Sequence, residues 1–172
     1  MQNILRVAAI LVGMLAYAVV PAAAQGNVPE IKQIKLTEKQ VQSFIAAQGD
    51  LDAVTSKIKG DKPDPKLVAE LEAAAKKHGF ASLEELDTVA ANISLVMSGF
   101  DPKTKEFSQP PEALKKEIAN LQADKAIPEK EKKEILNELN AALAYTKPVQ
   151  FPENVELIKK YYDKIEGSMA KG

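Results

Sequence analysis

The sequence predicts an all-α protein of about six amphipathic helices, and three observations lead to this prediction. From Thr37 onward, apolar residues recur at three- and four-residue intervals, which is the spacing of one face of a helix. Alternation of apolar and polar residues never lasts for more than a few positions, so we expect no strand. Prolines and glycines fall between the apolar stripes, where they can begin or end helices. We expect the helices to pack as one bundle-like domain.

The first three helices are predicted from their stripes and caps. The first covers about residues 38–59, and Gly49–Asp50 could kink it or split it in two. Asp64–Pro65 supplies an N-cap and a first-turn proline for the second helix, and Gly79 stands where a helix-ending glycine belongs. Ser82 opens the third helix.

The remaining three helices follow a long polar connection at residues 101–110. Pro111 begins the fourth helix, and Ile127–Pro128 ends it and starts the fifth. Pro148 and Pro152 bracket a turn before the sixth. The connection is expected to divide the domain into two three-helix halves. These halves are residues 37–100 and 111–169.

The chain begins with the features of a secretory signal peptide. Arg6 precedes an apolar run from Val7 to Val20, which Pro21 and Ala22–Ala24 follow. A basic start, an apolar segment of this length and small residues in an A-x-A arrangement are typical of a cleaved leader. The run is shorter than the roughly 20 apolar residues that cross a bilayer, although an uncleaved anchor is the alternative interpretation. We expect cleavage after Ala24 and a periplasmic or secreted protein.

The rest of the chain is predicted as a polar lead-in, residues 25–36, followed by a single helical domain, residues 37–172. No later stretch approaches the length of a membrane span, so none is expected in the mature chain.

Composition argues against several classes of function. Arg6 is the only arginine, and 23 basic residues face 24 acidic ones, so the chain is a poor candidate for binding nucleic acid. The absence of cysteine removes disulfides, thiol nucleophiles, iron–sulfur sites and cysteine-based zinc sites. We therefore expect no nucleic-acid partner and no cofactor.

His78 is the single histidine and the only candidate for general base catalysis by an imidazole. As a catalytic base it would need a nucleophile and an orienting carboxylate nearby. As a haem ligand it would need a partner such as Met97 or Met169, and the di-iron Glu-x-x-His pattern fails because residue 75 is alanine. We interpret His78 as the C-terminal residue of a helix, where a positive charge suits the helix dipole. The sequence thus predicts no enzyme and no metal site.

Aromatic residues gather in the second half of the chain. Tyr161 and Tyr162 are adjacent on the last helix, about 100° apart, so they are not expected to point fully inward together. Packing near the last turn is one interpretation of these side chains. The other is a shallow apolar groove for a peptide or a lipid-like ligand. The residues expected to line such a surface are Phe107, Phe151, Tyr161 and Tyr162.

Two strings predict helix starts of the same kind. Thr37 with Gln40 forms a capping box, in which each side chain bonds the backbone N–H of the other residue. Ser82 with Glu85 repeats the arrangement at the third helix. A capping role therefore accounts for both strings.

The first of these strings also carries a family resemblance. Leu36–Gln40 (LTEKQ) resembles the LTxxQ signature of Spy-like periplasmic chaperones, which are small exported helical proteins that shield unfolded clients. The string occurs once in this chain. Lys76–Leu86 and Asp87–Phe100 are similar to parts of small exported helical proteins of unknown function from Gram-negative bacteria. The first resemblance implies client binding, and the second implies only fold and export.

The sequence therefore predicts a non-enzymatic binding or chaperone-like protein whose expected partner is a protein or peptide client. The alternative is a structural envelope protein, a scaffold that depends on a partner and has no ligand pocket. An enzyme built on His78 is a third hypothesis.

Overall fold

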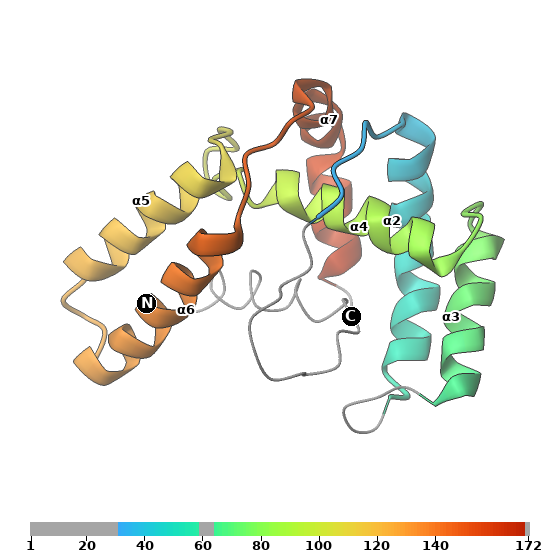
Figure 1. The fold of residues 1–172 in the computed structure, drawn as a ribbon, viewed down its shortest axis with the longest axis horizontal. Coiled ribbons are helices and arrows are strands. Elements are labelled where there is room, and N and C mark those ends of the chain that lie inside the picture. The colour runs from blue at the N-terminus through green and yellow to red at the C-terminus, as the bar shows by residue number, and fades with distance from the viewer. Residues whose placement is uncertain (1–30, 59–63, 171–172) are drawn as a thin grey trace.

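The computed structural model describes residues 31–58 and 64–170, and this part of the chain is helical (Figure 1). It contains six helices and, apart from one isolated antiparallel bridge between Phe100 and Phe107, no β-structure. The all-α prediction is confirmed. The predicted signal peptide and residues 25–30 of the lead-in lie outside the described residues. The helices are α2 (Glu38–Thr55), α3 (Pro65–Lys77), α4 (Leu83–Met97), α5 (Pro110–Ala123), α6 (Glu129–Tyr145) and α7 (Pro152–Met169).

The predicted capping box at the start of α2 is present in full. The Thr37 hydroxyl accepts a hydrogen bond from the Gln40 backbone N–H at 3.2 Å, and the Gln40 side chain accepts one from the Thr37 N–H at 3.0 Å. At α4, Ser82 caps the Glu85 N–H at 3.2 Å, but the Glu85 carboxylate bonds the N–H of Ala81 instead of that of Ser82. The second box is therefore shifted by one residue.

Helix boundaries differ from the prediction where side chains compete for the backbone. α2 runs through Gly49 without a break and ends at Thr55, earlier than expected. α5 ends at Ala123 rather than at Ile127, because the Asp124 carboxylate accepts the N–H of Ala126 at 2.7 Å and turns the chain. Gly79 has a φ of +88°, so the glycine that follows the end of α3 adopts the left-handed conformation, as predicted.

The main core is formed by α2, α3, α4 and α7, although α7 comes last in the chain. α7 packs against both α2 and α4. Several of its apolar side chains and those of its neighbours are completely buried, which indicates close packing. These fully buried side chains include Val41, Val89, Ile93, Ile158 and Ile165.

The other two helices, α5 and α6, pack mainly against each other and project to one side of the main core (Figure 1). Their own cluster has three buried leucines, Leu114, Leu121 and Leu139. At the base of this hairpin the Gln109 side chain accepts the N–H of Val149 at 2.8 Å, which joins its two ends. The helices therefore group as four and two, rather than as the predicted halves of three, because the turn after α6 returns α7 to the first core. None of the described helices has the length and apolarity required to cross a membrane.

Candidate functional site

The two adjacent tyrosines of α7 are both buried, with only 7% and 6% of their surface exposed. The Tyr161 hydroxyl faces α2, where it bonds the Glu38 carboxylate and accepts a hydrogen bond from Gln42 at 2.7 Å. Tyr162 faces the other way and packs edge-to-face on Phe100, with ring centroids 5.5 Å apart. The expectation that both could not point inward is therefore wrong. α7 lies between α2 and α4 and thus has two covered flanks.

The other two aromatic residues of the predicted surface lie in different places. Phe107 is half-buried and packs edge-to-face on Phe100 at 5.2 Å, so Phe100 joins it to Tyr162. Phe151 is half-buried at the N-cap of α7 and makes no ring contact with that group. The structure thus brings together two of the four residues through Phe100. A role in ligand binding for any of them stays a prediction.

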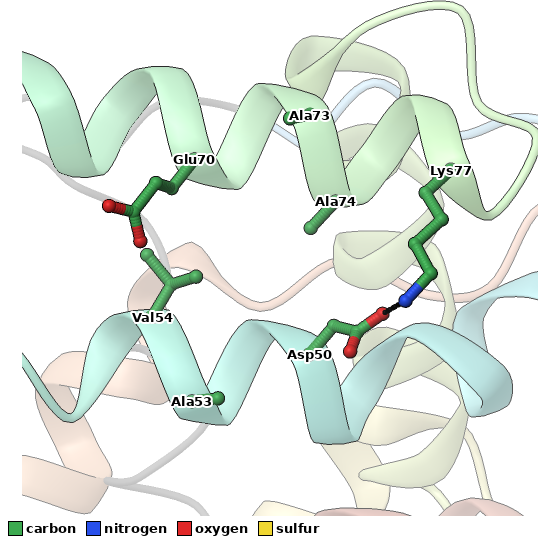
Figure 2. Close-up of a pocket in the computed structure, with 7 residues that line it drawn as sticks. All are labelled: Asp50, Ala53, Val54, Glu70, Ala73, Ala74 and Lys77. Atoms are coloured by element: carbon green, nitrogen blue, oxygen red, sulfur yellow. Dashed lines mark hydrogen bonds and ion pairs between the residues drawn. The ribbon is translucent and has the colours of Figure 1, made fainter.

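A shallow hollow of about 340 Å³ lies between α2 and α3 (Figure 2). Figure 2 shows the small apolar side chains that line it, Ala53, Val54, Ala73 and Ala74, and the charged side chains of Asp50, Glu70 and Lys77 on the same two helices. Each charged group already has an ion-pair partner, since Asp50 meets Lys77 at 2.7 Å and Glu70 meets Lys57 at 2.8 Å. The hollow therefore lacks the convergent polar groups that orient a small ligand.

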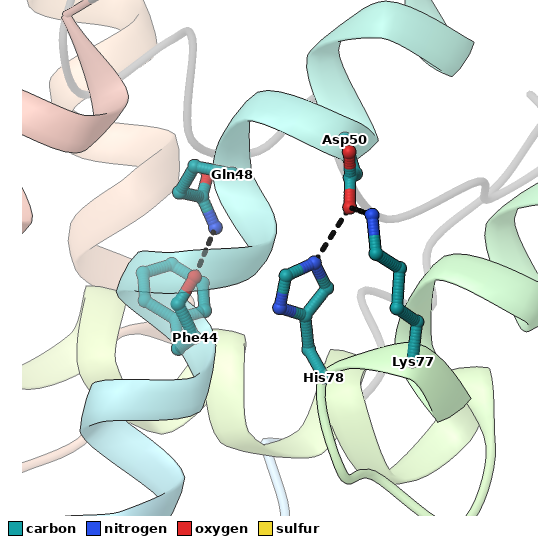
Figure 3. A network of polar contacts seen from close by, with 5 residues as sticks. All are labelled: Phe44, Gln48, Asp50, Lys77 and His78. Carbon is teal, nitrogen blue, oxygen red and sulfur yellow. Dashed lines mark hydrogen bonds and ion pairs between the residues drawn. The ribbon is translucent and has the colours of Figure 1, made fainter.

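His78 contributes to a polar network beside this hollow (Figure 3). Its Nε2 atom lies 2.7 Å from an Asp50 oxygen, and Lys77 bonds the same oxygen at 2.7 Å. Hydrogen bonds from Lys77, which has the larger effect, and from His78 lower the pKa of the Asp50 carboxyl. The network connects the C-terminal end of α3 to the middle of α2. Across the described residues, no group of three or more histidine and acidic side chains is placed to hold a metal ion.

The most extensive polar site surrounds residues 31–36, here called the strap. Two asparagines clamp it, Asn92 from α4 and Asn154 from α7, and each is only 2% exposed. Asn92 accepts the N–H of Ile34 at 2.9 Å and donates to the carbonyl oxygen of Lys32 at 2.9 Å. Asn154 donates to the carbonyl oxygen of Ile34 at 2.8 Å and accepts the N–H of Leu36 at 2.8 Å. Both backbone groups of Ile34 are therefore bonded by buried amides.

This bonding falls on every second residue of the strap, which is the pattern that a neighbouring β-strand would give. The side chains alternate in the same way. Ile34 is half-buried and Leu36 is buried, and both pack in the main core. Lys35 lies between them in the sequence, and Gln33 precedes Ile34. Gln33 bonds the backbone of Pro148 and Gln150 at 2.8 Å, and Lys35 forms a 2.8 Å ion pair with Glu153.

Sequence reasoning missed this clamp, although one signal was present. Asn92 interrupts the apolar stripe of α4 beside Ile93, and Asn154 lies one helical turn before Ile158 on α7. A polar residue on a buried stripe needs a hydrogen-bonding partner. The partner lies 58 residues away for Asn92 and 118 for Asn154, so the pairing required the tertiary structure.

Chemically, the clamp can bind a polypeptide main chain. A side-chain amide presents one acceptor and donors in the same plane, which matches the carbonyl and N–H groups of an extended chain. Within the described part of the protein, no buried side-chain nitrogen or oxygen lacks a hydrogen-bonding partner. The clamp is therefore complete with the strap in place.

Comparisons with protein-family models, with curated proteins and with solved structures found no match to this chain.

Proposed function

We propose that this protein is a non-enzymatic, exported binding protein that holds an extended polypeptide against α4 and α7. The place where the strap lies against these two helices is here called the groove. The observation that carries the proposal is the clamp, in which Asn92 and Asn154 bond the main chain of the strap at Lys32, Ile34 and Leu36. The strap is then the intramolecular occupant of a site that a client segment can also fill.

The clamp recognises main-chain atoms of the strap, which favours client binding over a purely structural role for these contacts. The four clamp bonds involve only backbone atoms of the strap, so they depend little on which residues occupy it. The strap lies at the surface of the protein, because Ile31, Lys32 and Lys35 are all exposed. Thr37 is exposed and caps the first turn of α2, so residues 31–36 can leave the groove while α2 stays in place.

The signal-peptide pattern of residues 1–24 supports export, and the resemblance of Leu36–Gln40 to the chaperone signature supports client binding. The chemistry of the site agrees with a protein that acts without catalysis, because asparagine amides form hydrogen bonds but supply neither a nucleophile nor a general base.

The proposal is tested by locking the strap in place. The chain has no cysteine, so a Lys35→Cys/Glu153→Cys variant carries two unique thiols that a bismaleimide reagent can join. The linked protein and the same variant capped with N-ethylmaleimide are compared in light-scattering assays with chemically unfolded citrate synthase. We expect the capped form to suppress aggregation and the linked form to lose this effect. Equal suppression by both forms, or none by either, would contradict the proposal.

A partner-dependent scaffold is the second candidate, and the α5–α6 hairpin favours it. Tyr145 at the end of α6 is 50% exposed, and Leu136 and Leu143 on the same helix are only partly covered. Such a surface can pack against a partner protein. Under this alternative, a Tyr145→Glu change abolishes a complex seen by native mass spectrometry of the exported protein, whereas Asn92→Ala leaves it intact. The reverse result excludes the hairpin as the docking surface.

A further inference from the structure

The strap itself indicates which segments the groove accepts. We propose that the site selects extended segments that carry an apolar–basic–apolar triplet, of which Ile34–Lys35–Leu36 is the intramolecular example. This inference rests on the proposed function and adds a specificity to it.

The two apolar positions are defined by burial. Ile34 packs against the main core and Leu36 is buried within it. Residues two apart in an extended chain point to the same side, so a client must offer two apolar side chains separated by one residue. A polar side chain at either position would lose hydration without gaining a partner.

The middle position is defined by charge. The Lys35 amine forms a 2.8 Å ion pair with Glu153, and this bond lowers the pKa of the Glu153 carboxyl. Glu153 belongs to the first turn of α7, where the helix dipole stabilises a negative charge. An acidic residue at this position would face that carboxylate, so the groove disfavours acidic segments.

The clamp fixes the register of the segment, that is, which residue occupies each of these positions. Both backbone groups of Ile34 are bonded, one by Asn92 and the other by Asn154. A shift of one residue would turn Lys35 toward the core and the apolar side chains toward solvent. The amides thus fix which residue of a segment meets Glu153.

The test uses the full chain with Ile34→Pro, which removes the N–H that Asn92 accepts and so weakens the strap. The probe is a fluorescein-labelled peptide with the sequence of residues 30–37 (EIKQIKLT), and anisotropy reports its binding. A second peptide carries glutamate at the position of Lys35. We expect the lysine peptide to bind about three- to tenfold more tightly at low salt. The expected ratio is modest, because solvent screens an exposed ion pair.

A charge reversal in the protein provides the matched experiment. Glu153→Lys should reverse the ranking of the two peptides, whereas Glu156→Lys, an exposed position on the same helix, should leave it unchanged. Ile34→Asp serves as a second strap variant if the proline variant does not fold. The wild-type protein should give the same ranking of the two peptides at higher peptide concentration, because its strap competes with the peptide for the groove.

The outcomes separate the two proposals. If neither peptide binds any of these proteins, both the proposed function and the specificity are wrong. If both peptides bind with equal affinity and Glu153→Lys changes nothing, the specificity is wrong and the groove still binds extended segments. A reversed ranking supports both.

Discussion

The main core and the α5–α6 hairpin bury apolar surface to very different extents. Four helices surround the main core, and its side chains include Ile93, Ile158 and Ile165, which have no exposed surface. In the apolar cluster of the hairpin, even the most buried leucine, Leu114, retains 5% exposure, and a larger set of apolar residues is only half-buried. Two helices packed on each other can cover only one face each, whereas α7 is covered on two flanks.

This difference separates two kinds of surface. The main core holds Asn92 and Asn154 on well-packed helices, so their amides are fixed in position, as recognition of a main chain requires. The hairpin presents partly covered apolar residues on a unit with little core of its own, and such units open locally at low cost in free energy. We therefore propose specific recognition at the α4–α7 groove and adaptable contacts at the hairpin.

The same leucine-to-alanine substitution in each region tests the difference in packing between them. Leu86→Ala in the main core is expected to lower the free energy of unfolding by about 3–5 kcal/mol, and Leu139→Ala in the hairpin by nearer to about 2 kcal/mol. The reason is that the looser hairpin can relax around the deleted side chain. Urea denaturation measures both values. Equal losses would show that the hairpin is packed as tightly as the main core.

The clamp should contribute more than the exposed contacts of the same strap. Asn154→Ala removes two hydrogen bonds and leaves two backbone groups without partners, so we expect a loss of about 2–3 kcal/mol. Gln33→Ala also removes two hydrogen bonds, but solvent can replace these exposed bonds, so the substitution should cost less than about 1 kcal/mol. Urea denaturation again provides the measurement. A smaller loss for Asn154→Ala than for Gln33→Ala would contradict the assignment of the clamp.

Two glycines differ in the space around them, Gly99 after the end of α4 and Gly49 within α2. An added Cβ at Gly99 would lie 2.4 Å from the Phe107 ring and from the carbonyl oxygen of Ser108, so Gly99→Ala should destabilise the protein by about 1–3 kcal/mol. Gly49→Ala, in the middle of α2 with open space around it, should stabilise it by about 0.5–1 kcal/mol. Thermal unfolding followed by circular dichroism measures both changes. Shifts of the same sign would be inconsistent with the contacts described at Gly99.

The smallest expected effect is a pH dependence of the α2–α3 contact. Because Lys77 and His78 lower the pKa of Asp50 in the folded state, this contact stabilises the protein above the ordinary carboxyl value of 3.8. Its contribution is lost as the pH falls through the lowered value. Asp50→Asn should therefore reduce stability slightly at neutral pH and flatten the acid limb of the stability profile. An unchanged acid limb would show that the network does not stabilise the fold.

Local features of the fold were predictable from sequence, and tertiary neighbours were not. The capping box of Thr37 and Gln40 and the glycine at position 79 depend on residues a few positions apart, so their patterns were sufficient. Nothing in the stripe of α7 indicates that it packs between α2 and α4, and this position explains why both tyrosines are buried.

The candidate site was predictable only in outline. The sequence indicated a binding protein, but it placed the expected surface on aromatic residues that turned out to be buried or half-buried. The sequence predicts a polar lead-in over residues 25–36, and the alternation of Gln33, Ile34, Lys35 and Leu36 within it is too short to predict a strand. The clamp depends on pairs of residues more than 50 positions apart, which no local pattern reveals.

We propose that the α4–α7 groove binds an extended main chain through its two asparagines. The most direct measurement is an anisotropy titration of the EIKQIKLT peptide onto two full-length proteins, Ile34→Pro and Ile34→Pro/Asn92→Ala. We predict saturable binding to the first and an affinity about tenfold lower for the second, since two hydrogen bonds to the peptide are lost. Equal binding to both proteins, or no binding to either when both are folded, would contradict the claim.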